Sequence, residues 1–227
     1  IPHRVAFFVS SHGFGHAARA ASIMSALHRL RPGIRFEVFT TIPRWFFEHS
    51  LGKARVGYHR IMTDIGLVQT DALREDLEGT LHRLEGFLPL DCNRTGEAAR
   101  RLESLGCEMV VCDISPIGLE AAGKAGIPSV LVENFTWDWI YSRYGDKEKR
   151  FLRYSEYLGA VFSRCDYHIQ TEPVCRPRNP DLTAFPMARL QRTPGAFVRD
   201  TLGLPRGAKA VLITMGGIPE KYRFLDS

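Results

Sequence analysis

The sequence predicts an α/β fold, a Rossmann-like parallel sheet with helices on both of its faces. The first observation is that short apolar runs of strand length alternate with longer stretches of helical periodicity from the start of the chain. The second is that the opening run, residues 4–9, is apolar in the manner of a buried parallel strand. The expected strands are residues 4–9, 35–40, 56–61, 109–112, 127–132 and 167–170.

Helices are expected in the crossovers between these strands. The first of them carries six apolar side chains on one face and is stopped by Pro32-Gly33. Pro116 stands at the expected start of a later helix, which closes at Gly126. Apolar periodicity and these punctuating residues predict helices over about 16–31, 43–51, 71–105 with an interruption near 89, and 116–126. The aromatic segment 135–144 is expected to lead into one more helix, which continues through about residue 164.

A change in composition divides the chain. Prolines become frequent between residues 172 and 205, and a new apolar run at 208–214 is followed by Met-Gly-Gly. We therefore expect a Rossmann-like domain at 1–187, a linker with a connecting helix at 188–207, and the first strand and Gly-Gly loop of a second domain at 208–227. In open parallel sheets, ligands bind beyond the carboxyl ends of the strands, so the loops there form the candidate site.

Charge and cysteine usage disfavour several classes of protein. The formal net charge is +5, but the basic residues are scattered, which argues against nucleic acid and suits a small anionic ligand such as a nucleotide sugar. No apolar run approaches the roughly 18 residues of a membrane span, and the cytoplasm is the expected location. The five cysteines show no paired spacing, so neither a disulfide framework nor a zinc site is expected: Cys92, Cys107, Cys112, Cys165 and Cys175.

A glycine-rich loop, SSHGFGH at residues 10–16, follows the first expected strand. Gly13 and Gly15 would let the backbone approach a ligand, and the amides that open the next helix favour an anion or a sugar oxygen. The spacing also fits a dinucleotide-binding fingerprint, but such a site wants an acidic residue at the end of the second strand. Thr40-Thr41 stands there instead, which counts against an oxidoreductase.

Two histidines frame this loop. Histidine side chains titrate at about pH 6.5 when unperturbed, so His16, in the first turn of the helix, could act as a general base facing the crevice. The alternative is that His12 or His16 only caps the helix or bonds within the loop.

Four segments in order carry a resemblance to a known family. They are SHGFGHAAR at 11–19, DIGLVQTDAL at 64–73, NFTWDWIY at 134–141 and MGG at 215–217. The first resembles the opening loop of glycosyltransferases of the two-domain GT-B type. It is also similar to loops of the nucleotide-sugar hydrolase of pseudaminic acid synthesis and of the N-acetylglucosaminyltransferase that makes lipid II. The full set most resembles the N-terminal glycosyltransferase-like region of L-arabinokinases.

The resemblance implies the N-terminal, acceptor-side half of a GT-B fold, with a nucleotide-sugar donor held mainly by a C-terminal domain that is otherwise absent. It implies no metal, and no Asp-x-Asp motif is present. His16 would match the base or water-positioning histidine, and Gly13 and Gly15 the loop glycines. The residues that would face the donor pyrophosphate are Met215, Gly216 and Gly217.

Further candidates lie where other strands end. Gln69 and Asp71 could bond sugar hydroxyls, although Asp71 could equally cap a helix. Asp113 could reach the cleft or cap the helix that starts near Pro116. Aromatic faces stack on sugars, so one tryptophan of the segment after 133 could touch ligand. The expected substrate-binding residues are His12, Gly13, Phe14, Gly15, Gln69, Asp71, Asp113, Glu133, Asn134 and Trp137.

Three functions remain open at this point. The first is a metal-independent glycosyltransferase with a donor that we expect to be UDP-linked and a small-molecule or glycan acceptor. A lipid acceptor would add peripheral membrane contact. The second is a nucleotide-sugar hydrolase, in which water replaces the acceptor. The third is a non-catalytic sugar-sensing domain fused to another activity such as a sugar kinase.

Overall fold

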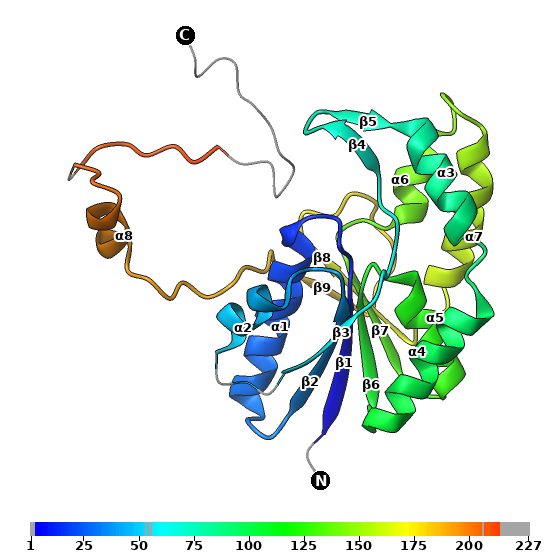
Figure 1. The fold of residues 1–227 in the computed structure, drawn as a ribbon, viewed down its shortest axis with the longest axis horizontal. Helices are drawn as coiled ribbons and strands as arrows, with labels where there is room; N and C mark the ends of the chain where they lie inside the picture. Colours follow the sequence, from blue (N-terminus) through cyan, green and yellow to red (C-terminus); the bar gives the residue numbers. More distant parts are fainter. Residues whose placement is uncertain (1–2, 53, 55, 206, 214–227) are drawn as a thin grey trace.

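The computed structural model describes residues 3–52, 54, 56–205 and 207–213. In this part of the chain, one parallel sheet of seven strands has the order β3-β2-β1-β6-β7-β8-β9, with helices on both faces (Figure 1). The predicted α/β class is therefore confirmed. The strands of the sheet are β1 Arg4–Val9, β2 Arg35–Thr40, β3 Val56–Arg60, β6 Met109–Asp113, β7 Ser129–Glu133, β8 Tyr167–Thr171 and β9 Leu182–Ala184.

The helices form two layers because adjacent side chains of each strand point to opposite faces of the sheet. Phe7 of β1 packs with α1 and α2 on one face, and Phe8 packs with α4, α5 and α7 on the other. The helices are α1 Phe14–Leu30, α2 Arg44–Leu51, α3 Leu77–Phe87, α4 Cys92–Leu105, α5 Pro116–Ala125, α6 Trp137–Tyr144, α7 Arg150–Phe162 and α8 Gly195–Thr201.

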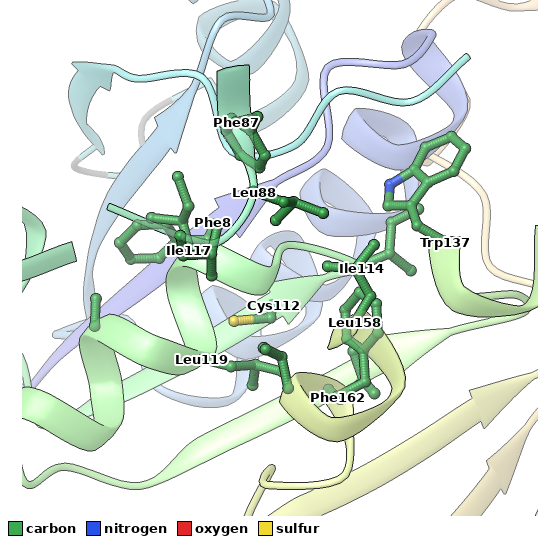
Figure 2. Close-up of a cluster of buried hydrophobic side chains, with 14 of the residues drawn as sticks. Phe8, Phe87, Leu88, Cys112, Ile114, Ile117, Leu119, Trp137, Leu158 and Phe162 are labelled. Carbon is green, nitrogen blue, oxygen red and sulfur yellow. The ribbon is translucent and has the colours of Figure 1, made fainter. Parts of the chain in front are cut away.

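The core on the second face is closely packed (Figure 2). Phe8, Cys112 and Ile117 are fully buried there. A Cβ atom on Gly118 of α5 would lie 2.5 Å from Sγ of Cys112 and 2.6 Å from Cβ of Phe8. Since real Cβ atoms do not approach so closely, the glycine lets α5 lie directly against the sheet. This contact fixes the end of β6, where Asp113 stands.

The order of the strands reverses beside β1. The chain moves outward from β1 through β2 to β3, returns to β6 on the other side of β1, and then moves outward again through β7 to β9. The loops after β1 and β6 therefore leave the sheet on opposite sides of a topological switch point. A ligand crevice at the carboxyl edge is expected there.

The long helix expected over 71–105 is wrong in its first part. Residues Val68–Asp71 and Arg74–Asp76 form an antiparallel hairpin, β4 and β5. The carboxylate of Asp71 accepts a hydrogen bond from the amide of Leu73 at 2.9 Å, which closes a turn instead of capping a helix. Asp76 is the cap of α3, because its side chain accepts from the amide of Gly79. The interruption near residue 89 is confirmed between α3 and α4.

Other boundaries also differ from the expectation. The aromatic segment 135–144, expected only to lead into a helix, itself contains the helix α6, and the expected helix follows it as α7. The three-residue strand β9 was not expected, because Leu182–Ala184 is too short to show a periodic pattern. A helix, α8, does lie within 188–207, but residues 208–213 form no strand and are largely exposed. The rest of the segment 214–227 lies outside the described residues, so the second domain stays a prediction.

Candidate functional site

The loop after β1 lies at the switch point. Gly13 immediately precedes α1 and has φ 89° and ψ 162°, a backbone conformation that residues with a Cβ atom rarely adopt. The loop is tied to the end of β2, since the hydroxyl of Thr41 bonds that of Ser11 at 2.6 Å and the amide of Thr41 donates to the same oxygen. The threonines that stand where a dinucleotide site needs an acid therefore hold the loop. α1 begins with no side-chain cap.

His16, Arg19 and Asp113 form a buried cluster at this edge, which we name the His-Asp-Arg cluster. Nδ1 of His16 lies 2.7 Å from one carboxylate oxygen of Asp113. The guanidinium of Arg19 donates to both oxygens of Asp113, each at 2.7 Å. The three residues are only 8%, 8% and 2% exposed, respectively. Asp113 thus does not cap the next helix, where Ser115 is the cap.

Opposite charges govern the ionisation of this cluster. Burial alone would raise the pKa of Asp113, but Arg19 and His16 outweigh it and hold that pKa below its ordinary value. Burial likewise opposes the charge of Arg19, yet Asp113 outweighs it and raises the pKa of the guanidinium. A carboxylate and a guanidinium are therefore both charged inside the protein. The bidentate geometry offsets part of the cost of burying both charges.

The cluster leaves one atom of His16 available. A carboxylate only accepts hydrogen bonds, so Nδ1 is the ring nitrogen that donates to Asp113, and Nε2 is the ring nitrogen outside this contact. Among the described residues, no hydrogen-bond partner of Nε2 is found. The ring of Phe135 packs edge-on against the imidazole, with ring centres 5.6 Å apart. A histidine oriented by a carboxylate in this way is able to accept a proton from a bound hydroxyl.

Arg19 also connects the cluster to the next two strands. Its Nη1 atom donates to the side chains of Asn134 at 2.8 Å and Thr171 at 3.2 Å. Glu133, at the end of β7, is buried, and His168 and Gln170 both bond the same oxygen of its carboxylate, at 2.8 and 2.7 Å. The structure therefore brings Asn134 into the cluster and places Glu133 in a neighbouring network.

A second buried group lies beside the loop. Asp64, which is 6% exposed, accepts a hydrogen bond from the indole of Trp137 at 2.7 Å. Burial raises the pKa of Asp64. His12 packs edge-on against Trp137, and its pKa is lowered by burial and by the nearby His16. Trp137 is fully buried, so its contribution is to fix His12 and Asp64.

Gly66 makes the position of His12 possible. It has φ +68°, and a Cβ built there would lie 2.5 Å from Nδ1 of His12. Its carbonyl accepts a hydrogen bond from the hydroxyl of Tyr141 at 2.8 Å. The connection from β3 to β4 is therefore held against both the glycine loop and α6.

The remaining residues that the sequence predicted for the site do not belong to the His-Asp-Arg cluster. Phe14 stacks on Phe46 of α2 at 5.2 Å, so its ring is used in packing. Gly15 is exposed, and a Cβ added to it would meet no atom within 4 Å, so the loop is open there. Gln69 and Asp71 belong to the β4–β5 hairpin, above the carboxyl edge in Figure 1. Met215, Gly216 and Gly217 lie outside the described residues.

Arg19 and Thr171 belong to the site but were not predicted from the sequence. Arg19 lies three residues after His16 and hence on the same face of α1, a spacing that could have indicated a paired role. Thr171 ends a short strand without any motif, and only the topology places it beside β7.

Within the described residues, no helix combines the length and hydropathy that a membrane crossing needs.

Fold and site together define a Rossmann-like α/β domain with a buried His-Asp-Arg cluster at the carboxyl edge of its sheet. In sequence, the chain is 28% identical over 229 residues to L-arabinokinase from Arabidopsis thaliana, a match that covers 98% of this chain and 22% of the kinase. The resemblance seen in the four segments is therefore confirmed over nearly the whole chain. The chain spans less than a quarter of that relative's length. No model of a known protein family matches.

Several solved structures are similar to this chain over about half of their own length. MurG from Acinetobacter baumannii has a TM-score of 0.47 and 14% identity, over 84% of this chain and 47% of that chain. UGT71G1 from Medicago truncatula, solved with UDP-glucose, has a TM-score of 0.48 and 11% identity, over 74% and 45%. The spinosyn forosaminyltransferase SpnP has a TM-score of 0.47 and 15% identity, over 80% and 50%.

Proposed function

We propose that this domain is the acceptor side of a GT-B-type glycosyltransferase and that His16 is its general base. The observation that carries the proposal is the 2.7 Å contact between His16 and Asp113, at the switch point of the sheet. A carboxylate that fixes the tautomer and orientation of an imidazole is the arrangement that proton abstraction from a hydroxyl requires.

The proposed reaction is a displacement at the anomeric carbon of a nucleotide sugar. Nε2 of His16 accepts the proton of the acceptor hydroxyl, and the acceptor oxygen forms a bond to the anomeric carbon. The bond from that carbon to the diphosphate oxygen breaks, and its electron pair leaves with the nucleoside diphosphate. The positive charge that develops on the imidazole is stabilised by Asp113, which Arg19 holds in place.

The glycine loop is proposed to contact the substrates through its backbone. The exposed Gly15 and the uncapped start of α1 offer amide donors to a sugar or phosphate oxygen. We expect a UDP-linked donor, with Met215, Gly216 and Gly217 on the donor side, and an acceptor that is a small molecule, a glycan or a lipid. The same geometry would serve a nucleotide-sugar hydrolase, with water in the place of the acceptor.

One observation favours a second candidate, a sugar-sensing domain without catalysis. The sequence match is to an L-arabinokinase of which this chain spans 22%, so an equivalent domain occurs there within a much longer protein. In that case, the cluster would bind a sugar hydroxyl and report its presence to another domain.

The full-length protein, incubated with a panel of UDP-sugars, separates these candidates. Transfer predicts that UDP is released together with a glycosylated product and that release depends on an added acceptor. Hydrolysis predicts UDP and free sugar in equal amounts without an acceptor. If no donor is turned over while a free sugar binds the protein and changes a second activity, the transferase proposal fails and the sensing role is supported.

A further inference from the structure

We propose that a cavity lined by arginines beside α4 binds a small phosphorylated metabolite, such as a sugar phosphate. The cavity has a volume of about 860 Å³ and lies between α4 and the end of β3, the edge strand of the sheet. It does not include the residues of the His-Asp-Arg cluster. Binding there would not depend on the activity proposed above.

Most of the charged side chains that line the cavity are positive. Four arginines line it and only one carboxylate, that of Glu97. None of the four forms an ion pair within 4.0 Å with an acidic side chain of the described chain, unlike Arg150 and Arg164 elsewhere on the surface. Guanidinium groups without an acidic partner that line one cavity favour an anionic ligand. The four are Arg60, Arg94, Arg100 and Arg101.

The fold positions these groups from two elements. α4 contributes Arg94, Arg100 and Arg101. Arg94 and Arg101 are two turns apart and therefore on one face of the helix. The guanidinium of Arg94 is 5.2 Å from the ring centre of Phe87, which restricts its movement. Arg60 ends β3, directly after His59, whose ring is fixed by a 2.8 Å contact with Glu37. The arginine sites are thus attached to regular structure rather than to loops.

Size and lining narrow the class of ligand. A guanidinium binds phosphate through two parallel hydrogen bonds, so several arginines can enclose a phosphate group. The volume is within the range of about 300–1,000 Å³ that small-molecule sites have, and it is too large for one phosphate ion alone. Apolar side chains line the remainder, including the half-exposed Met62. A phosphate carried on a compact organic body matches both parts.

The test is titration calorimetry of the full-length protein with glucose 1-phosphate, inorganic phosphate and glucose. The Arg60→Ala/Arg101→Ala variant should weaken glucose 1-phosphate binding at least tenfold. The matched control, Arg83→Ala/Arg143→Ala, removes two exposed arginines from elsewhere and should stay within twofold of the parent. Any binding of glucose should be the same in the parent and in both double variants, and inorganic phosphate should bind more weakly than glucose 1-phosphate. Thermal unfolding checks that both variants are folded.

Several results would overturn the inference. The first is that the two double variants bind glucose 1-phosphate equally well. The second is that the protein binds inorganic phosphate as tightly as glucose 1-phosphate. The third is that binding of glucose 1-phosphate is lost only in His16→Ala, which would place the ligand at the His-Asp-Arg cluster. If glucose 1-phosphate fails to bind while a single-stranded RNA does so through Arg60 and Arg101, the cavity is a nucleic-acid surface instead. Retained binding in His16→Ala supports the inference whether or not the transferase proposal holds.

Discussion

Replacing Asp113 with asparagine tests the electrostatics of the cluster. The variant keeps the shape of the side chain but removes the charge that neutralises Arg19, which is 8% exposed and donates two 2.7 Å hydrogen bonds to this carboxylate. Removing one partner of a buried ion pair costs about 3–5 kcal/mol, because the other charge is left uncompensated. For a domain of this size, the melting temperature should fall by roughly 6–20 °C.

Urea unfolding of a double-mutant cycle measures this cost. We expect Asp113→Asn alone to be severely destabilising. The double variant Asp113→Asn/Arg19→Met should recover at least about 1 kcal/mol of the unfolding free energy, because it no longer contains the unpaired buried charge. The lowered pKa of Asp113 also fixes how the stability changes with pH. The stabilisation by this carboxylate is present above the pKa that the group has in the unfolded chain, and it is lost as the pH falls through the pKa of the folded protein. A cost below about 1 kcal/mol, or strictly additive effects of the two changes, would refute the reasoning.

Three further predictions concern His12 and two glycines, Gly66 and Gly15. The pKa of His12 is lowered in the folded protein, so its contribution to stability is present above about pH 6.5 and is lost as the pH falls toward the folded pKa. The variant His12→Phe lacks this titrating group. When unfolding is followed from pH 8 to pH 5, it should therefore lose less stability than the control variant His82→Ala, which changes an exposed histidine. Equal pH profiles would contradict this. Gly66→Ala should cost about 1–3 kcal/mol, because it combines a positive φ with the steric clash against His12. Gly15→Ala, which meets no atom within 4 Å, should leave the melting temperature within a few degrees, and a larger loss would show that the loop is packed more tightly than its open surroundings indicate.

The layers of the fold were predictable because buried parallel strands are nearly continuous apolar runs. β1 and β2 begin and end at the expected residues. The hairpin at Val68–Asp76 was not predictable in the same way. Its strands are short and polar, and the turn depends on a local hydrogen bond that the side chain of Asp71 accepts from the amide of Leu73 and that competes with a helix. Periodicity carries no information on such a bond.

The site was predictable in part for a related reason. The glycine loop follows a strong strand, so His16 could be placed at the carboxyl edge from the sequence alone. Its partnership with Asp113 spans 97 positions and depends on the pairing of β1 with β6, which no local pattern reveals. The burial of Trp137 behind Asp64 was equally hidden, because an aromatic residue after a strand can serve either the core or a ligand.

The rate of sugar transfer by His16→Ala tests the central claim most directly. Assayed in the full-length protein with its best donor and acceptor, this variant should lose about 10²–10⁴-fold in kcat/KM, as expected when a general base is removed. His82→Ala should retain the parental rate. If His16→Ala, shown to be folded, transfers sugar as fast as the parent, His16 is not the base and the proposed mechanism is wrong.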